Sequence, residues 1–438
     1  MTKKIQLIAV CVLLMFASCS KDDSVTPGTP HTVDVSSIAL NKSTVTLNVG
    51  EKYSLTATVA PENATDSTVT WTSNNESIAT VGSTGLKTAL ITAIASGSAT
   101  VTAKAGNKAI TCAITVKEPV NVYDVYVAGY EKNTNGKSVA KIWKNGEELL
   151  NITNGTYDAE AKSIFVSGST TYVAGFETNE SGRRVAKLWK DGAPQTLQLD
   201  GTEASEALSV YVSGNDVHVS GYEGNSSYHN IAKVWKNGMA TPLTNGSNSA
   251  EARSIFVSGS DVYVAGYEHN GNKYVAKVWK NNNLLYQLGI SSKDTDAFSV
   301  FIADGDVYVA GHEQNGTAFV AKLWKNGVAE DFAANKNAQI RSVYVSDNNV
   351  YVAGNEKEGM HADAAKVWKN GTGTALTDGS AFAHANSVAV AEGKVYVAGD
   401  ETASTNKTVA KIWINDTAES LTDGSKDAKA LSIFVKAK

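Results

Sequence analysis

The sequence predicts an all-β protein in which a small N-terminal β-sandwich precedes a β-propeller of seven blades. Short runs over residues 32–117 alternate apolar and polar side chains, and a repeat of about 45 residues without helical periodicity fills the rest of the chain. The 438 residues include 36 glycines but only 6 prolines, which is typical of strands joined by tight turns. The formal net charge of −5 shows no basic excess, so we expect no nucleic-acid partner.

The N-terminus indicates export. Lys3 and Lys4 precede an uncharged, largely apolar run at residues 5–16, which is too short to span a bilayer. The run ends in Phe-Ala-Ser-Cys19, which resembles a bacterial lipobox. The resemblance implies a lipoprotein signal peptide at residues 1–18, lipidation of Cys19, and an anchor and linker at residues 19–31. The alternative is an ordinary cleaved signal with an incidental cysteine.

A charged segment follows the predicted lipidation site. Ser-Lys-Asp-Asp at residues 20–23 resembles the surface-export signal of Bacteroidetes lipoproteins. This resemblance implies a protein attached to outer-membrane lipid through Cys19 and exposed at the cell surface. A short charged linker is the alternative interpretation.

The segment 32–117 is predicted to be a sandwich of antiparallel strands. It resembles the bacterial Ig-like domain, group 2, over nearly its whole length. The matching elements are Leu-Asn-Val-Gly at 47–50, Ala-Thr-Val-Ala-Pro at 57–61, Val-Thr-Trp at 69–71, Ile-Ala-Thr-Val at 78–81, Gly-Ser-Ala-Thr-Val at 97–101 and Cys-Ala-Ile-Thr-Val at 112–116. The resemblance implies a spacer or adhesive module with Trp71 in its core.

Cys112 is the one cysteine of this sandwich, and it stands alone in an apolar strand. A lone thiol in such a strand is predicted to be a small buried hydrophobe. The sequence contains no disulfide framework and no Cys-His metal spacing. We therefore expect no metal and no cofactor.

The propeller is predicted for residues 118–438, where three elements recur. The first is Ala-Lys-x-Trp, with tryptophans at 143, 189, 235, 279, 324, 368 and 413. The second is a strand ending in Gly-x-Glu, with glycines at 129, 175, 221, 266, 311, 354 and 399. The third is a strand that starts with serine, at 163, 209, 254, 299, 342, 387 and 432. Such a period predicts blades of four strands, for which we expect strand a at 254–257, b at 262–266, c at 275–279 and d near 241–243.

The ends of the repeat predict how the ring closes. The first unit begins at strand b, at residues 122–127, and residues 431–435 form an additional strand a at the C-terminus. The C-terminal strand is therefore expected to complete the first blade, because closure leaves no exposed sheet edge.

Two sets of charged or variable positions are candidates for a function. Each strand b ends in Glu and each strand c carries Lys, which is either a charged ring that binds a ligand or a pair repeated for structural reasons. The repetition favours the structural interpretation, as it does for the seven tryptophans. A single ligand breaks sevenfold symmetry, so its site should lie where the repeats differ.

Two positions near the axis differ between repeats. One lies three residues before the repeated serine of strand a, and the other lies one residue before it. From these we select as ligand-binding candidates at the channel mouth Glu160, Glu206, Glu251, Arg253, Asp296, Phe298, Arg341 and His384. The equivalent positions elsewhere hold Lys162, Leu208, Gln339, Asn386, Lys429 and Leu431. Solvated loop residues are the alternative interpretation.

The sequence favours binding over catalysis. It contains no nucleophile elbow, no zinc-protease motif and no phosphate loop, and no catalytic residue is named. We expect a non-catalytic surface lipoprotein whose propeller loop face captures a glycan. A protein-binding adhesin or complex subunit is the first alternative, and a propeller glycoside hydrolase or polysaccharide lyase is the second.

Overall fold

The computed structural model describes residues 32–117, 123–201, 203–290, 292–316, 318–332, 337–357 and 362–438. The predicted signal peptide, Cys19 and linker lie outside the described residues. All regular elements of the described chain are β-strands, so the all-β prediction is confirmed. No helix long and apolar enough to cross a membrane occurs in this part of the chain. The chain divides into two compact units, residues 1–121 and 122–438, each of which is considered by itself.

The N-terminal unit is a sandwich of two four-stranded sheets. One sheet has the order β1 (Ser37–Leu40), β3 (Lys52–Ala60), β6 (Thr88–Ala93) and β5 (Ala79–Ser83). The other has the order β2 (Thr44–Asn48), β8 (Lys108–Lys117), β7 (Gly97–Ala105) and β4 (Thr70–Ser73). Alternating side chains of both sheets form one core that includes Leu55, Ile91 and Val101. Trp71 and the free thiol of Cys112 also lie in this core, as predicted, and burial raises the pKa of the thiol.

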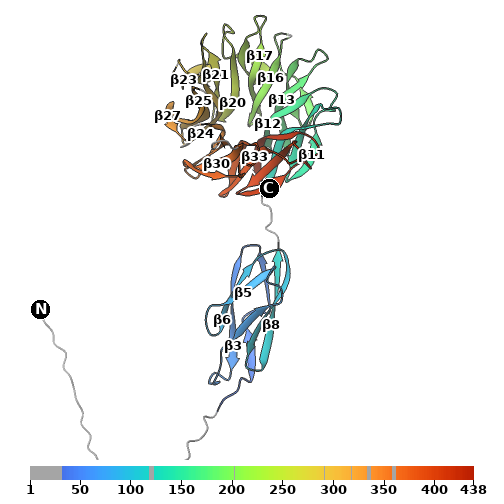
Figure 1. Ribbon diagram of the computed structural model, residues 1–438, viewed down its shortest axis with the longest axis vertical. Helices are drawn as coiled ribbons and strands as arrows, with labels where there is room; N and C mark the ends of the chain where they lie inside the picture. Colours follow the sequence, from blue (N-terminus) through green and yellow to red (C-terminus); the bar gives the residue numbers. More distant parts are fainter. Residues whose placement is uncertain are drawn as a thin grey trace, which may run out of the picture. The chain divides into compact units, whose positions relative to one another are not determined.

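The second unit, called here the repeat unit, contains seven four-stranded antiparallel sheets in its described residues. Figure 1 shows these sheets side by side around a common centre. Sheet 1 consists of β36 (Ala428–Ala437), β9 (Tyr123–Lys132), β10 (Ser138–Lys144) and β11 (Glu147–Asn151). Its first strand comes from the C-terminus, and β36 pairs antiparallel with β9 as the sequence predicts.

The other six sheets follow the chain in the order a, b, c, d. Strands a are β12 (Ala159–Ser167), β16 (Ser205–Ser213), β20 (Ala250–Ser258), β24 (Thr295–Ala303), β28 (Ala338–Ser346) and β32 (Ala383–Ala391). Strands b are β13 (Thr170–Thr178), β17 (Asp216–Gly224), β21 (Asp261–His269), β25 (Asp306–Asn315), β29 (Asn349–Lys357) and β33 (Lys394–Thr402). Strands c are β14 (Arg184–Lys190), β18 (Asn230–Lys236), β22 (Tyr274–Lys280), β26 (Ala318–Lys325), β30 (Asp363–Lys369) and β34 (Thr408–Ile414). Strands d are β15 (Ala193–Gln195), β19 (Met239–Pro242), β23 (Asn283–Gln287), β27 (Val328–Asp331), β31 (Thr372–Ala375) and β35 (Thr417–Ser420).

Strands a, b and c are longer than predicted, with bounds Ala250–Ser258, Asp261–His269 and Tyr274–Lys280, and strand d is shifted. Strand d of sheet 3 runs over Met239–Pro242 instead of 241–243, because the turn at Asn237 and Gly238 has only two residues. Both turn residues have positive φ, 51° and 85°, and the Asn237 side chain accepts a hydrogen bond from Val217 N at 2.8 Å. Strand a of sheet 4 begins at Ala250 instead of Ser254, so the residues that the sequence placed before the strand lie inside it.

The seven serines of strand a link neighbouring sheets. Ser209 Oγ of sheet 3, for example, accepts a hydrogen bond from Ile255 N of sheet 4 at 3.3 Å. The other pairs are Ser163 with Val210, Ser254 with Val300, Ser299 with Val343, Ser342 with Val388, Ser387 with Ile433, and Ser432 with Ile164. Because the last pair joins sheet 1 to sheet 2, this chain of contacts returns to its starting point.

Aromatic and apolar side chains pack in the same order. Phe434, Phe165, Tyr211, Phe256, Phe301 and Tyr344 form successive ring contacts with centroids 4.8–4.9 Å apart. Sheet 7 holds Ala389 at this position. Farther from the centre, the tryptophan that recurs in each repeat packs between neighbouring sheets. Trp279 of sheet 4, for example, shares a core cluster with Ala232 and Val234 of sheet 3. The predicted role of these tryptophans in packing is confirmed.

A close backbone approach explains why every strand b contains the repeated glycine. A β-carbon on Gly266 would lie 1.9 Å from the carbonyl oxygen of Glu251 on strand a. The other six glycines face the same obstacle at 1.9–2.0 Å from the carbonyl oxygens of Lys429, Glu160, Glu206, Asp296, Gln339 and His384. Any side chain at these positions must therefore push two paired strands apart.

We predict that Gly266→Ala lowers the free energy of unfolding of the repeat unit by about 1–3 kcal/mol, the usual cost of forcing an atom into a packed interior. The matched control is Gly201→Ala, because a β-carbon there meets its nearest atom at an ordinary 3.6 Å. The control should change stability by no more than about 0.5 kcal/mol. Denaturant unfolding followed by tryptophan fluorescence measures both, and equal stability of the two variants would contradict the proposed clash.

Candidate functional site

A β-bulge on each strand a creates the candidate site. In sheet 4 the pairing with strand b shifts between Ala252 and Ser254, so Arg253 is an additional residue on strand a. The same shift occurs at the same place in all seven sheets. A bulge redirects the side chain of the additional residue. The seven bulge residues are Lys162, Leu208, Arg253, Phe298, Arg341, Asn386 and Leu431.

The side chains of all seven bulge residues line one hollow of about 410 Å³, called here the axial hollow. Glu206, Glu251 and Gln339 complete its lining. The structure thus brings together five of the eight predicted site residues: Glu206, Glu251, Arg253, Phe298 and Arg341. The other three, Glu160, Asp296 and His384, lie on the same strands but are not among the described residues that line the hollow.

The interpretation of these positions as loop residues is wrong, although all but Glu206 remain partly exposed. All eight predicted site residues belong to strands a, and Glu206 is only 4% exposed. The bulge explains the error, because it breaks the alternation of buried and exposed residues in the middle of the strand. The half of the strand before the bulge therefore looks like a loop in the sequence.

Arg253 is held from several directions. Its Nε donates to Glu251 Oε2 at 3.2 Å, and its Nη1 donates to Asp296 Oδ2 of the next sheet at 2.5 Å. The guanidinium also lies 4.9 Å from the ring centre of Tyr267 and 4.6 Å from that of Phe298. Arg253 is therefore a fixed part of the wall, with its guanidinium in contact with two carboxyl groups and two aromatic rings.

The neighbouring acids are also paired. Glu206 accepts hydrogen bonds from Arg184 Nη1 at 2.5 Å and from the Tyr222 hydroxyl at 2.8 Å. Burial and the Glu206 charge raise the pKa of Tyr222, which keeps this phenol a hydrogen-bond donor. Lys162 forms an ion pair with Glu160.

A second network lies on the side of sheets 6 and 7. Arg341 Nη1 donates to Asn386 Oδ1 at 2.8 Å, and Asn386 Nδ2 donates to Asp400 Oδ1 at 3.0 Å. Asp400 also contacts His384 Nδ1 at 2.9 Å and Lys429 Nζ at 3.7 Å. Burial alone would raise the pKa of Asp400, but the His384 hydrogen bond and the Lys429 charge bring it below its ordinary value.

Two titratable side chains of sheet 5, Asp296 and His312, each have one polar atom without a hydrogen-bond partner among the described residues. Neither Asp296 Oδ1 nor His312 Nδ1 has a hydrogen bond within the described part of the chain, and both atoms are buried. Burial outweighs the attraction of Arg253 and raises the pKa of Asp296 to about 7. Burial and the charges of Arg253 and Arg341 lower the pKa of His312 to about 4.

Several residues of this site were missed from the sequence. They follow the repeated glycine on strand b, and they are Tyr130, Phe176, Tyr222, Tyr267, His312, Asn355 and Asp400. Arg184 of strand c was missed as well. A signal for them was present, because these positions also vary between repeats, and the criterion that selected the strand-a residues would have selected them too.

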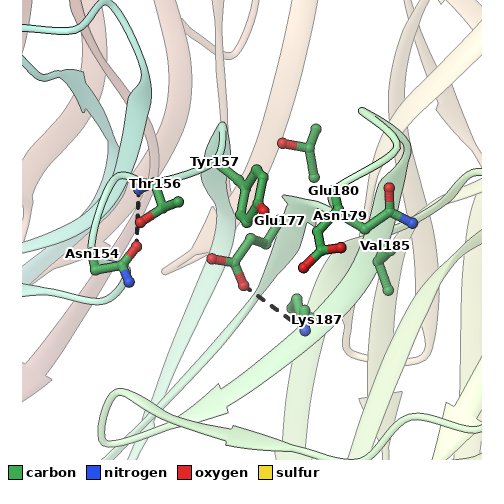
Figure 2. A pocket seen from close by; sticks show the side chains of 9 residues that line it. Asn154, Thr156, Tyr157, Glu177, Asn179, Glu180, Val185 and Lys187 are labelled. Atoms are coloured by element: carbon green, nitrogen blue, oxygen red, sulfur yellow. Dashed lines mark hydrogen bonds and ion pairs between the residues drawn. The ribbon is translucent and has the colours of Figure 1, made fainter.

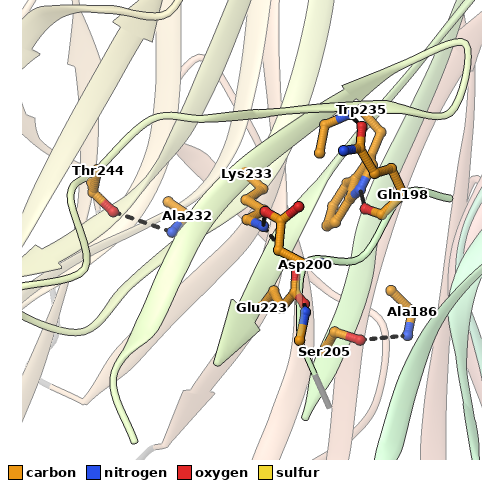
Figure 3. A network of polar contacts seen from close by, with 11 residues as sticks. Ala186, Gln198, Asp200, Ser205, Glu223, Ala232, Lys233, Trp235 and Thr244 are labelled. Carbon is orange, nitrogen blue, oxygen red and sulfur yellow. Dashed lines mark hydrogen bonds and ion pairs between the residues drawn. The ribbon is translucent and has the colours of Figure 1, made fainter. Parts of the chain in front are cut away.

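The repeated Glu and Lys residues form ion pairs, as the structural interpretation predicts. The pairs are Glu131–Lys141, Glu177–Lys187, Glu223–Lys233, Glu268–Lys277, Glu356–Lys366 and Glu401–Lys411. In sheet 3, Lys233 Nζ is buried between Glu223 Oε2 at 2.6 Å and Asp200 Oδ2 at 2.5 Å (Figure 3). Glu223 also accepts a hydrogen bond from Gly201 N at 2.7 Å, which ties the loop between sheets to the pair.

Other hollows, with volumes of about 350–520 Å³, lie at some of these pairs. One of about 350 Å³ is lined by Asn154, Tyr157, Glu177 and Lys187, among others (Figure 2). The Glu177–Lys187 contact is long, at 3.9 Å. Similar hollows occur at sheets 1, 3 and 7, so these sites repeat and lack the variation of the axial hollow. No cluster of three His, Cys, Asp or Glu residues suited to a metal ion occurs among the described residues.

The buried His312 predicts an acid-sensitive step in stability. The unfolded imidazole binds a proton below its ordinary pKa of 6.5, whereas the folded one does so only near 4. The stability that neutral His312 provides is therefore present above pH 6.5 and lost as the pH falls to 4, and it amounts to on the order of 3 kcal/mol. His312→Tyr should remove this loss, because tyrosine occupies the same position at Tyr130, Tyr222 and Tyr267.

Denaturant unfolding of both proteins at pH 4 to 7 is the measurement. The raised pKa of Asp296 has the opposite effect, because it makes the folded protein more stable as the pH falls. This contribution is present in both proteins and largely cancels when their stabilities are compared. Parallel stability curves for the wild type and His312→Tyr would show that His312 is not the responsible group.

Comparison with known proteins identifies the N-terminal unit. Residues 34–114 match the family of the bacterial Ig-like domain, group 2. An Ig-like virion protein of Serratia phage KSP90 is 44% identical over 90 residues, which is 20% of this chain and 34% of that protein. The chain therefore spans about a third of the length of this curated relative.

Solved structures give only weak likenesses. A putative TolB from Agrobacterium tumefaciens is 9% identical, with a TM-score of 0.35, over 72% of this chain and 99% of that one. An α-L-arabinofuranosidase from Clostridium thermocellum is 12% identical, with a TM-score of 0.28, over 52% of this chain and 94% of that one. Likenesses this low support no argument about fold or function. The comparisons thus establish that residues 34–114 are a bacterial Ig-like domain of group 2.

Proposed function

We propose that the chain is a non-catalytic binding lipoprotein of the cell surface whose repeat unit is a closed seven-bladed β-propeller that captures a glycan. The observation that carries this proposal is the convergence of seven bulge side chains, of five different kinds, on one axial hollow. The sheets otherwise repeat the same packing, so selection for a ligand explains why the lining positions differ. A volume of about 410 Å³ suits one or two sugar rings.

Closure of the propeller is supported by contacts between first strands. The serine hydrogen bonds run from sheet to sheet, and Ser432 of sheet 1 bonds to Ile164 N of sheet 2 at 3.2 Å. The pairing of β36 with β9 joins the two ends of the repeat unit. The C-terminal strand thereby gives sheet 1 the strand a that the other six sheets take from their own repeat.

The chemistry of the hollow favours a polar ligand with apolar ring faces. Gln339 and Asn386 provide amide groups for hydroxyls, while Phe298, Leu208 and Leu431 provide apolar surface. Sugars combine both kinds of surface. A protein loop is the main alternative ligand, and the experiment below separates the two.

The carboxylates argue for binding without catalysis. Asp296 has the raised pKa that a general acid requires, but its free oxygen is buried and the residue does not line the hollow within the described chain. Glu206 and Glu251, which do line it, are occupied by Arg184 and Arg253. Glycoside cleavage needs two available carboxyl groups facing the substrate.

We expect affinity electrophoresis of the purified protein, through gels that contain plant, mucin or bacterial polysaccharides, to show retardation by at least one glycan without release of sugar ends. Leu208→Trp should abolish the retardation, because the indole fills the hollow without removing any ion pair. Lys190→Ala is the control, since Lys190 is exposed at the opposite, c–d end of its strand. Unchanged mobility in every gel would overturn glycan binding and favour a protein partner, whereas new sugar ends would indicate an enzyme.

The proposed anchor gives a separate prediction. In a bacterial host that processes lipoproteins, the wild type should incorporate labelled palmitate and remain with the outer membrane, where protease added to intact cells reaches it. Cys19→Ala should lose the label and leave the membrane fraction, because the thiol that carries the lipid is gone. Palmitate incorporation by Cys19→Ala would rule out Cys19 as the lipidated residue.

A further inference from the structure

The three cations on the bulges have different surroundings. Lys162 is paired with Glu160, two residues earlier on the same strand. Arg253 is paired with Glu251, also two residues earlier, and with Asp296 of the next sheet. A carboxylate that pairs with a bulge cation therefore lies in one of two positions: two residues earlier on the same strand, or at the equivalent position of the next sheet.

At Arg341, both of these positions hold a different residue. Gln339 stands two residues earlier, and His384 stands in the next sheet where Asp296 stands for Arg253. No carboxylate of the described chain forms an ion pair with Arg341, and the hydrogen bond that its guanidinium makes there goes to the neutral amide of Asn386. Arg341 is therefore a half-buried cation whose usual partners have been replaced.

Arg341 has donors left for a ligand in the axial hollow. A guanidinium has five N–H donors, and the Asn386 contact uses one of them. Arg341 lines the hollow, and its nitrogens are absent from the buried polar atoms of the described chain that lack a partner. The unused donors are thus reachable from the hollow and are not sealed in the protein.

More distant acids do not take the place of a contacting anion. Asp400 and Asp363 favour the charged form of Arg341 through space, but burial has the larger effect and lowers the pKa of the guanidinium. Asp400 is already bound by His384 and Asn386, and Asp363 accepts a hydrogen bond from Asn355 Nδ2 at 3.2 Å. An anion bound from the hollow would offset the burial of Arg341 directly.

We propose that Arg341 binds the carboxylate of an acidic sugar, so that the axial hollow selects uronate-containing glycans over neutral ones. The planar guanidinium fork matches a carboxylate with two parallel hydrogen bonds. Gln339 lies beside Arg341 in the lining and can bind hydroxyls of the same sugar, and Phe298 of the adjacent sheet offers its ring. Asn386 Nδ2 already donates to Asp400 and to the Ala430 carbonyl, so this residue can only accept one more hydrogen bond on Oδ1. This inference rests on the proposed glycan binding and names the class of glycan.

The test compares polyuronates with their own carboxyl-reduced forms, in which each uronate has become a neutral hexose. The probes are polygalacturonate, alginate and hyaluronan, with a sulfated polysaccharide as a separate anion, all at physiological ionic strength to suppress unspecific attraction. We expect the full-length protein to bind at least one polyuronate and to bind its carboxyl-reduced form about 10- to 150-fold more weakly, as for the loss of hydrogen bonds to a charged group.

Two variants assign that preference to Arg341. Arg341→Gln removes the guanidinium, whereas Gln339→Glu keeps it and places a carboxylate where Glu251 stands for Arg253. Both should lower the ratio of polyuronate affinity to reduced-form affinity about 10- to 150-fold, whatever each variant does to the binding of the reduced form itself. Thermal unfolding confirms that each variant is folded, and Gln339→Glu provides the test if Arg341→Gln is unstable.

The outcomes distinguish the proposed glycan binding from the proposed role of Arg341 in selecting uronates. Equal binding of a polyuronate and its reduced form, or variants that weaken both alike, would overturn the role of Arg341 while glycan binding stands. Binding of the sulfated polysaccharide alone, lost in Arg341→Gln, would replace the carboxylate by a sulfate ester. Absence of binding to every glycan would overturn the proposed function together with this inference.

Discussion

In every sheet of the repeat unit, a carbonyl oxygen of strand a lies where a β-carbon of the strand-b glycine would stand. At Gly266 this distance is 1.9 Å, so only hydrogen fits there. The approach accompanies the bulge that follows on strand a, and the bulge in turn directs one side chain per sheet into the axial hollow. The glycine is thus a structural residue on which the whole lining of the candidate site depends, although it lines nothing itself.

The repeat unit separates a uniform frame from a variable interior. Serine hydroxyls join neighbouring sheets and tryptophans pack between them in nearly the same way throughout the repeat unit, and within the described residues Glu–Lys pairs recur in six of its sheets. The side chains at the bulge positions do not take part in these contacts between sheets, because they point into the axial hollow. They are therefore free to differ, and lysine, arginine, phenylalanine, asparagine and leucine all occur there. In the proposed propeller, a regular frame in this way supports an asymmetric site.

The sequence was sufficient for the period, the two-residue turns and the pairing of the C-terminal strand, because these leave repeated residues at fixed spacing. It also identified the bulge residues, but for an incomplete reason. Positions such as Arg253 were placed in a loop, since the bulge interrupts the alternation by which a strand is recognised. The positions of Tyr222 and Arg184 vary between repeats and could have been selected by that criterion, but their contacts with Glu206 join three strands, and spacing along one strand does not reveal such contacts.

The charges around the axial hollow also show why a raised carboxyl pKa does not by itself identify a catalytic group. Asp296 has such a pKa because it is buried, and Arg253 stands between it and the hollow with a contact of 2.5 Å. A ligand in the hollow therefore meets the guanidinium before it can meet the acid. For Asp296 to exchange a proton with that ligand, Arg253 would have to leave two carboxylates and two aromatic rings. The arrangement stabilises a rigid wall, and rigid walls with one uncompensated cation are suited to hold an anion in place.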